Sequence, residues 1–231
     1  MPYRKLPNTD LSRINALETA LERCQRENTP GIVIPTLYIQ EMKGFLPGFK
    51  SAQLAYQQAL DQQQQSSLKY QKKFNVARMY VSHFLQVFQF CILRKEFRPE
   101  IRSLYKLPID SSNLPELSTE TQLLECCAHV IEGERIRTSQ GGVPIYNPTI
   151  AKVNVHCTMF KETAQEHKVF QGNTHRTLEQ LRILRPEADR LILNVWNAVE
   201  THFKHLEEKN FYQSCSEYGV RYYKRKAKHD D

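Results

Sequence analysis

The sequence predicts an all-α protein, and three observations support this fold class. Apolar residues recur at steps of three and four along most of the chain, which is the spacing of one helix face. Only eight glycines occur in 231 residues, and the periodic segments contain few β-branched runs. An apolar fraction of 40%, with eleven Phe and eleven Tyr, indicates a packed core rather than disorder. We therefore expect a helical bundle.

The first helix is expected within residues 6–28. Polar residues at 8–10 can cap its start, because a side-chain oxygen there accepts from a free backbone N–H of the first turn. The Asn-Thr-Pro-Gly stretch at 28–31 ends it. Residues 32–35 then form an extended connector, since the residue before a proline is pushed out of the helical region.

Two helices should follow this connector. The first runs over about 35–62 and is expected to kink or break at 44–48, where Pro47 removes a backbone donor. The glutamine-rich stretch at 62–67 is interpreted as a solvated turn. The second is a central helix over 76–93, which ends before Pro99. Its apolar face is expected to contain the residues spaced by three and four: Val76, Met79, Tyr80, His83, Phe84, Val87, Phe88 and Cys91.

The rest of the chain resembles a second pass through the same plan. Residues 1–108 form the first predicted unit, 109–118 a linker rich in proline and serine, and 119–220 a second unit packed on the first. Expected helices at 119–135, 150–170 (ended by Gly172-Asn173) and 174–208 follow at an offset of roughly 110 residues from their counterparts. The sequence thus predicts a tandem pseudo-repeat of two related three-helix units.

The formal charge of +7 favours a polyanionic partner, because a basic surplus attracts phosphate at long range. It is equally typical of ordinary solubility charge. Residues 221–231 form a basic tail with two tyrosines that could stack on bases. The candidate nucleic-acid or anion contacts are Arg221, Lys224, Arg225, Lys226 and Lys228.

The sequence indicates a soluble, cytoplasmic protein. The N-terminus lacks the apolar core of a signal peptide, and no run reaches the ~18–20 apolar residues of a membrane span. We therefore expect no membrane partner. The six cysteines contain no C-x-x-C pair and are interpreted as reduced core residues.

Catalytic and cofactor motifs are not evident, so no catalytic, cofactor-binding or metal-binding residue is assigned. None of the eight histidines has the Glu three residues earlier that di-iron bundles use. His202 and His205 are interpreted as a solvated face, and His83 as a core histidine. Arg78 and Arg190 occupy corresponding positions in the two passes, and each fits an anion contact or a salt bridge between units.

The opening stretch MPYRKLPNTD, the leucine-periodic helix after it and the Pro-Thr connector resemble an uncharacterised bacterial family of helical proteins. The resemblance implies no activity and transfers no functional residue. We expect a non-enzymatic helical interaction or scaffold protein, with a protein partner or a homodimer. Nucleic-acid binding through the basic surplus is the first alternative, and a metal-dependent helical-bundle enzyme is the second.

Overall fold

The computed structural model describes residues 2–26 and 31–223, and these residues confirm the all-α class. Six helices and one short antiparallel strand pair are present in this part of the chain. In chain order the elements are β1 (Tyr3–Arg4), α1 (Asp10–Arg26), α2 (Thr36–Leu93), the 3₁₀ helix η1 (Pro99–Tyr105), α3 (Glu120–Ser139), α4 (Ile150–Phe203), α5 (Glu208–Glu217) and β2 (Tyr222–Tyr223).

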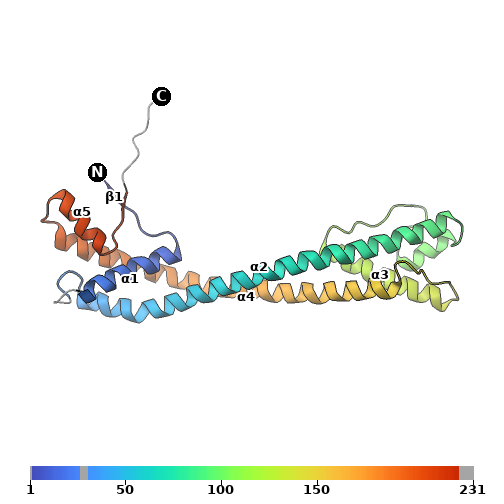
Figure 1. Ribbon diagram of the computed structural model, residues 1–231, viewed down its shortest axis with the longest axis horizontal. Coiled ribbons are helices and arrows are strands. Elements are labelled where there is room, and N and C mark those ends of the chain that lie inside the picture. Colours follow the sequence, from blue (N-terminus) through green and yellow to red (C-terminus); the bar gives the residue numbers. More distant parts are fainter. Residues whose placement is uncertain (1, 27–30, 224–231) are drawn as a thin grey trace, which may run out of the picture. The chain divides into compact units, whose positions relative to one another are not determined.

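The chain forms two compact units, one of residues 1–60 and 173–231 and one of residues 61–172. The long helices α2 and α4 each contribute to both units (Figure 1). Because each repeat predicted from the sequence contains one of these helices, the compact units do not follow the predicted boundaries at 108 and 119. The expected linker at 109–118 carries no helix and lies inside the second unit. The repeat itself stays a prediction.

The expectation of two helices between residues 35 and 93 is wrong, because α2 is continuous over 58 residues with Pro47 inside it. A proline inside a helix costs about 3 kcal/mol, and packing on either side of it opposes the break. Met42 and Phe49 are fully buried, and the ring of Phe49 stacks on that of Phe45 at 5.4 Å. Their burial contributes roughly 1.5–3 kcal/mol per side chain, which is enough to offset the proline.

The expected turn at 62–67 and the expected stop at Gly172 are also helical. Ser66 is buried, and its Oγ lies 3.2 Å from Nδ1 of His167 on α4. A Cβ added at Gly172 would meet no other atom within 4 Å, so α4 is not closely packed at this position. The Ser66–His167 contact favours a continuous α2 through the glutamine-rich stretch, where local propensity predicts a turn.

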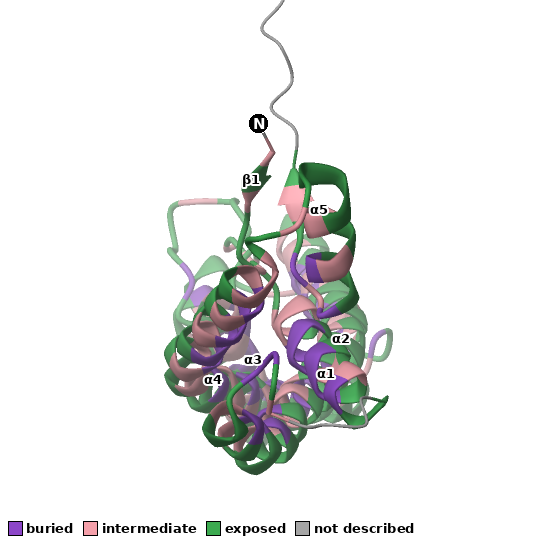
Figure 2. Cartoon of the chain, turned by 90° about the vertical axis from the view of Figure 1, so that its left-hand side faces the viewer, coloured by how far each residue is buried: buried purple, intermediate pink, exposed green. Residues whose placement is uncertain are grey.

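The first unit packs α1 and α5 against the beginning of α2 and the end of α4 (Figure 1). The buried residues of α1 lie on one side of the helix (Figure 2), and Trp196 of α4 is fully buried in the same core. At the start of α1, Asp10 receives a bidentate hydrogen bond from Arg185 at 2.9 and 2.8 Å. Arg13 contacts Asp189 in the same way at 2.8 and 3.0 Å. These paired contacts fix α1 on α4 with defined geometry.

The second unit packs η1 and α3 against the end of α2 and the beginning of α4. The α2 residues that face this core are Phe74, Ala77, Val81, Phe84, Leu85, Phe88 and Cys91. The apolar face predicted for the central helix is therefore rotated, because Met79 and His83 are exposed while Val81 and Leu85 are buried. Both sides of this helix carry apolar residues, so periodicity alone could not identify the buried one.

A fully buried charge cluster joins three elements of the second unit. Glu134 accepts from Arg137, at 2.8 and 2.9 Å, and from the hydroxyl of Tyr105 at 2.5 Å. The same carboxylate accepts from the backbone N–H of Ile145 at 3.1 Å, while Arg137 donates to the carbonyl of Val143 at 2.9 Å. Every charge is paired, as burial requires. The cluster holds η1 and the loop after α3 against α3.

A disulfide links Cys127 of α3 to Cys157 of α4. The expectation that all six cysteines are reduced is therefore wrong for this pair. The other four, Cys24, Cys91, Cys126 and Cys215, are buried and form no disulfide. Burial raises the pKa of the Cys126 thiol to about 11, so it stays protonated near neutral pH and is a poor nucleophile.

By length and composition alone, α2 could cross a membrane. It contains an 18-residue window with a mean hydropathy of 1.2, of which 33% is buried. Such a window also occurs in core helices of soluble proteins, and Phe84, Leu85 and Phe88 do pack in the core of the second unit. The finding leaves the predicted location untested.

Candidate functional site

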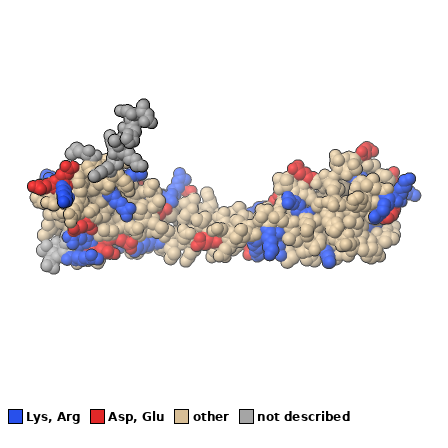
Figure 3. All heavy atoms as spheres, turned by 45° about the horizontal axis from the view of Figure 1, so that its top comes forward, with Lys and Arg blue, Asp and Glu red and all other residues tan. Residues whose placement is uncertain are grey.

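The structure describes one of the five predicted anion-contact residues. Arg221 is exposed and precedes β2, and its backbone carbonyl accepts from Lys5 N–H at 3.3 Å. The remaining four, at 224, 225, 226 and 228, lie outside the described residues. On the face drawn in Figure 3, Lys and Arg side chains are interspersed with Asp and Glu rather than forming one continuous area. Nucleic-acid binding stays an alternative from the sequence.

The described histidines do not assemble into a metal site. The rings of His202 and His205 lie 6.4 Å apart, and no group of three potential His, Cys, Asp or Glu ligands occurs within residues 2–26 and 31–223. His156 stacks on Tyr80 with ring centroids 4.1 Å apart. The prediction that His83 is a core residue is wrong, because this side chain is exposed on α2.

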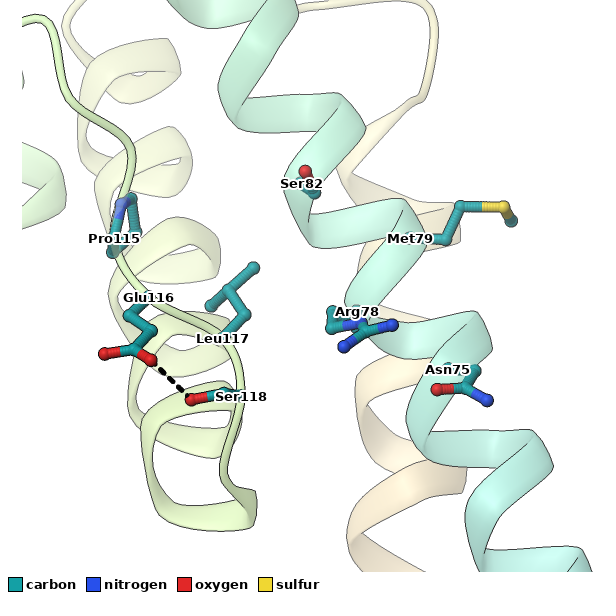
Figure 4. A pocket seen from close by; sticks show the side chains of 8 residues that line it. All are labelled: Asn75, Arg78, Met79, Ser82, Pro115, Glu116, Leu117 and Ser118. Carbon is teal, nitrogen blue, oxygen red and sulfur yellow. Dashed lines mark hydrogen bonds between the residues drawn. The ribbon is translucent and has the colours of Figure 1, made fainter.

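A cavity of about 410 Å³ in the second unit is the candidate binding site. One wall is α2 and the other is the extended segment 115–118 that precedes α3 (Figure 4). Arg78 lies between Leu117 on one side and Met79 on the other. The lining residues are Asn75, Arg78, Met79, Ser82, Pro115, Glu116, Leu117 and Ser118. The site is an open groove at the protein surface rather than an enclosed cavity.

The acidic group of this cavity is already satisfied. Glu116 accepts from the Ser118 hydroxyl at 2.8 Å, the contact drawn as a dashed line in Figure 4. Its second oxygen lies 3.5 Å from the side-chain nitrogen of Gln122. In Figure 4 the carboxylate turns toward Ser118 and away from Arg78, and the two form no ion pair.

The side chains on the α2 side of this site have hydrogen-bond donors that the contacts among the described residues do not use. The carbonyl oxygen of Asn75 accepts from Gln71 at 3.3 Å, which leaves its amide N–H groups to donate. Ser82 accepts from Gln86 at 3.1 Å, which leaves its own O–H to donate. The guanidinium of Arg78 lies 5.6 Å from the Phe74 ring centroid, and among the described residues it has no acidic partner. The site therefore offers donors together with one positive charge.

Arg190, the predicted counterpart of Arg78, is neutralised within the first unit. It contacts Glu187 at 2.6 Å and Glu41 at 3.0 Å. Hydrogen bonds to these carboxylates raise the pKa of its guanidinium. Of the two arginines that the sequence marked as anion contacts, the structure leaves only Arg78 without a carboxylate among the described residues.

A second feature of the same unit is a row of exposed side chains on α2, which we call the α2 stripe. Its members follow steps of three and four and lie on the side of the helix opposite the core: Leu68, Lys72, Asn75, Met79, His83, Gln86, Phe90 and Leu93. The exposed fractions of Leu68, Met79, Phe90 and Leu93 are 71%, 57%, 56% and 64%. Polar side chains separate Leu68, Met79 and Phe90 along the stripe, and only Phe90 and Leu93 are neighbours. A row of large exposed apolar residues on one helix face is a candidate interaction surface.

Comparison with models of known protein families, with curated proteins and with solved structures finds no match. The resemblance to a bacterial helical family therefore stays a prediction. The 115–118 wall could not be anticipated, because that stretch resembles a linker. Of the α2 stripe, only Met79 and His83 belonged to the predicted buried face, and both are exposed. The available signal was the excess of apolar residues in 76–93, which is more than one buried face requires.

Proposed function

We propose that the protein is a non-enzymatic helical interaction protein that self-associates through the α2 stripe. The observation that carries the proposal is the exposure of Leu68, Met79, Phe90 and Leu93 on one face of α2 in the second unit. Removing these side chains from water would stabilise an association by about 25 cal/mol per Å² of apolar surface, before the costs of ordering.

The spacing of the stripe favours a second copy as the occupant. Leu68 and Phe90 each lie eleven residues from Met79, and eleven residues are close to three full turns, so they stay on one face. An antiparallel copy related by a two-fold axis at Met79 would place Leu68 against Phe90 and Met79 against itself. The interface would thus be isologous and closed.

The polar members of the stripe are compatible with this pairing. The same axis would place Lys72 opposite Gln86 and Asn75 opposite His83, so no two like charges meet at neutral pH. The stripe from Leu68 to Leu93 is about 37 Å long at 1.5 Å per residue. A single helix pair of this length lies at the low end of specific interfaces. We therefore expect a dissociation constant on the order of micromolar or weaker.

Sedimentation velocity over a protein series from ~5 to ~500 µM tests the proposal in a range that covers this affinity. The parent chain should shift from monomer to dimer. Phe90→Ser and Leu68→Ser should remain monomeric, whereas Leu37→Ser should dimerise like the parent. Leu37 is the matched control because it is equally exposed, at 61%, on the part of α2 in the other unit.

The position of the axis has its own test. Met79→Cys should give a disulfide-linked dimer under mild oxidation, because the new thiol would face its own copy. Leu37→Cys should not do so. A parent chain that stays monomeric at all concentrations, or a Met79→Cys variant that cross-links no faster than Leu37→Cys, would contradict the proposal.

The tandem repeat and the cytoplasmic location belong to this proposal as well. The order of elements supports a repeat: a short helix, α1 or α3, precedes a long helix, α2 or α4, in each half of the chain. On this reading each pass is a pair of helices rather than three. Nucleic-acid binding predicts salt-sensitive retention on DNA or RNA, and no retention at ~50 mM salt would remove it.

A further inference from the structure

We infer that the cavity between α2 and residues 115–118 binds a small monocarboxylate that carries an apolar group. The site shares Asn75 and Met79 with the α2 stripe, so ligand binding is tested in a variant that does not form the proposed dimer, and failure of one proposal can be told from failure of the other.

The unused groups of the cavity select an anion. Arg78 has no carboxylate partner among the described residues, and Asn75 and Ser82 each keep a donor. These three residues are spaced by three and four on α2, so they lie on one side of the helix. A planar guanidinium recognises a carboxylate through two parallel hydrogen bonds.

The charge balance favours a single negative charge over a phosphate dianion. Glu116 lines the same cavity, and its carboxylate would repel a second negative charge. Only one arginine and no lysine line the cavity, whereas phosphate sites generally combine several donors with more than one positive group or a helix N-terminus. Arg78 and Glu116 together give the site no net charge, so each further negative charge on a ligand adds repulsion, and a monocarboxylate adds the least.

The remaining wall is apolar. Leu117 points from the extended segment toward α2 in Figure 4, and Met79 lies on the other side of Arg78. An aliphatic or aromatic group can pack on Leu117 and Pro115, whereas the Met79 side chain points away from the 115–118 segment in Figure 4. A free organic acid and the C-terminus of a peptide ending in an apolar residue share this chemistry, and the probes below separate them.

Isothermal titration calorimetry with three probes tests the inference. N-acetyl-leucine represents a peptide C-terminus, 4-phenylbutyrate represents a free organic acid, and N-acetyl-leucinamide is the uncharged control. At least one acid should bind, and the amide should bind at least ~10-fold more weakly because it lacks the charge-assisted pair. The tighter of the two acids identifies the source of the carboxylate.

Arg78→Gln should weaken binding of the acid at least ~10-fold, whereas Arg98→Gln should leave it unchanged. Arg98 is the matched control because it is exposed in the same unit and has no ion pair among the described residues. Both variants are measured in the Phe90→Ser background, and circular dichroism confirms that each is folded. Absence of binding by both acids, equal binding of the amide, tighter binding of inorganic phosphate, or an unchanged Arg78→Gln variant would overturn the inference.

Discussion

Reduction of the Cys127–Cys157 disulfide should destabilise the second unit by an amount that follows from the loop it closes. The two cysteines are 30 residues apart in sequence. The chain-entropy relation for a loop of this size gives about 3.5 kcal/mol at 25 °C. With a urea m-value of about 1–3 kcal/mol/M, the midpoint should fall by roughly 1.2–3.5 M. Urea titrations with and without a phosphine reductant, followed by far-UV circular dichroism, measure the shift.

The protein has a single tryptophan, so its fluorescence reports on the unfolding of one unit. Trp196 lies in the first unit, while the disulfide lies in the second. If the units unfold separately, the fluorescence transition should change less than the circular dichroism transition. The Cys127→Ser, Cys157→Ser double variant should unfold like the reduced parent and should not respond to the reductant. A count of six titratable thiols in the denatured, non-reduced chain, instead of four, would refute the reasoning.

Three further predictions concern the second unit. Glu134→Ala should lower the free energy of unfolding by about 3–5 kcal/mol, because it leaves the buried guanidinium of Arg137 unpaired. Urea unfolding measures this free energy, and a loss below 1 kcal/mol would contradict the prediction. Gly133→Ala should cost about 1–3 kcal/mol, because its Cβ would lie 2.8 Å from the Leu104 carbonyl oxygen. Gly172→Ala, with open space, should instead stabilise by about 0.5–1 kcal/mol. Burial, then the hydrogen bond to Glu120, raises the pKa of Tyr70 to about 12. The folded state keeps this proton when the unfolded chain has lost it, so stability should fall as the pH rises from 10 to 12. Burial also raises the pKa of Tyr105 and Tyr222, so absorbance titration at 295 nm should show at least three tyrosinates fewer at pH 11 in the folded parent than in its unfolded state. Tyr70→Phe should reduce that difference by one.

Local signals predicted where several helices begin. The polar cluster at 8–10 precedes the start of α1 at Asp10. Thr119 caps α3 through a capping box with Gln122, which agrees with the predicted start at 119. These signals act within one turn of the chain, so they can be seen in the sequence. The helical class follows from the same local periodicity.

Continuity of the long helices could not be predicted in this way. Local propensity predicts that Pro47 and Gly172 each interrupt a helix. Only contacts with residues far away in sequence show that the helix passes through them. The buried Ser66–His167 pair, for example, joins residues 101 positions apart. The same limit applies to the disulfide, because residue spacing does not show which cysteines meet in space. It also applies to the cavity, whose second wall looked like a linker.

The two arginines at corresponding positions connect the predicted repeat to the candidate site. If the two halves descend from one helical pair, Arg78 and Arg190 started in equivalent surroundings. Arg190 pairs with two carboxylates within 3.0 Å. One belongs to Glu187, three residues earlier on α4, and the other belongs to Glu41 of α2. Arg78 has instead an aromatic ring and an open cavity. A structural role would be served by neutralising both arginines, as the chain does at Arg13, Arg137 and Arg185. Arg78 is exposed and lies beside Phe74 and the open groove, so its guanidinium is accessible to the carboxylate inferred above, whereas that of Arg190 is already paired.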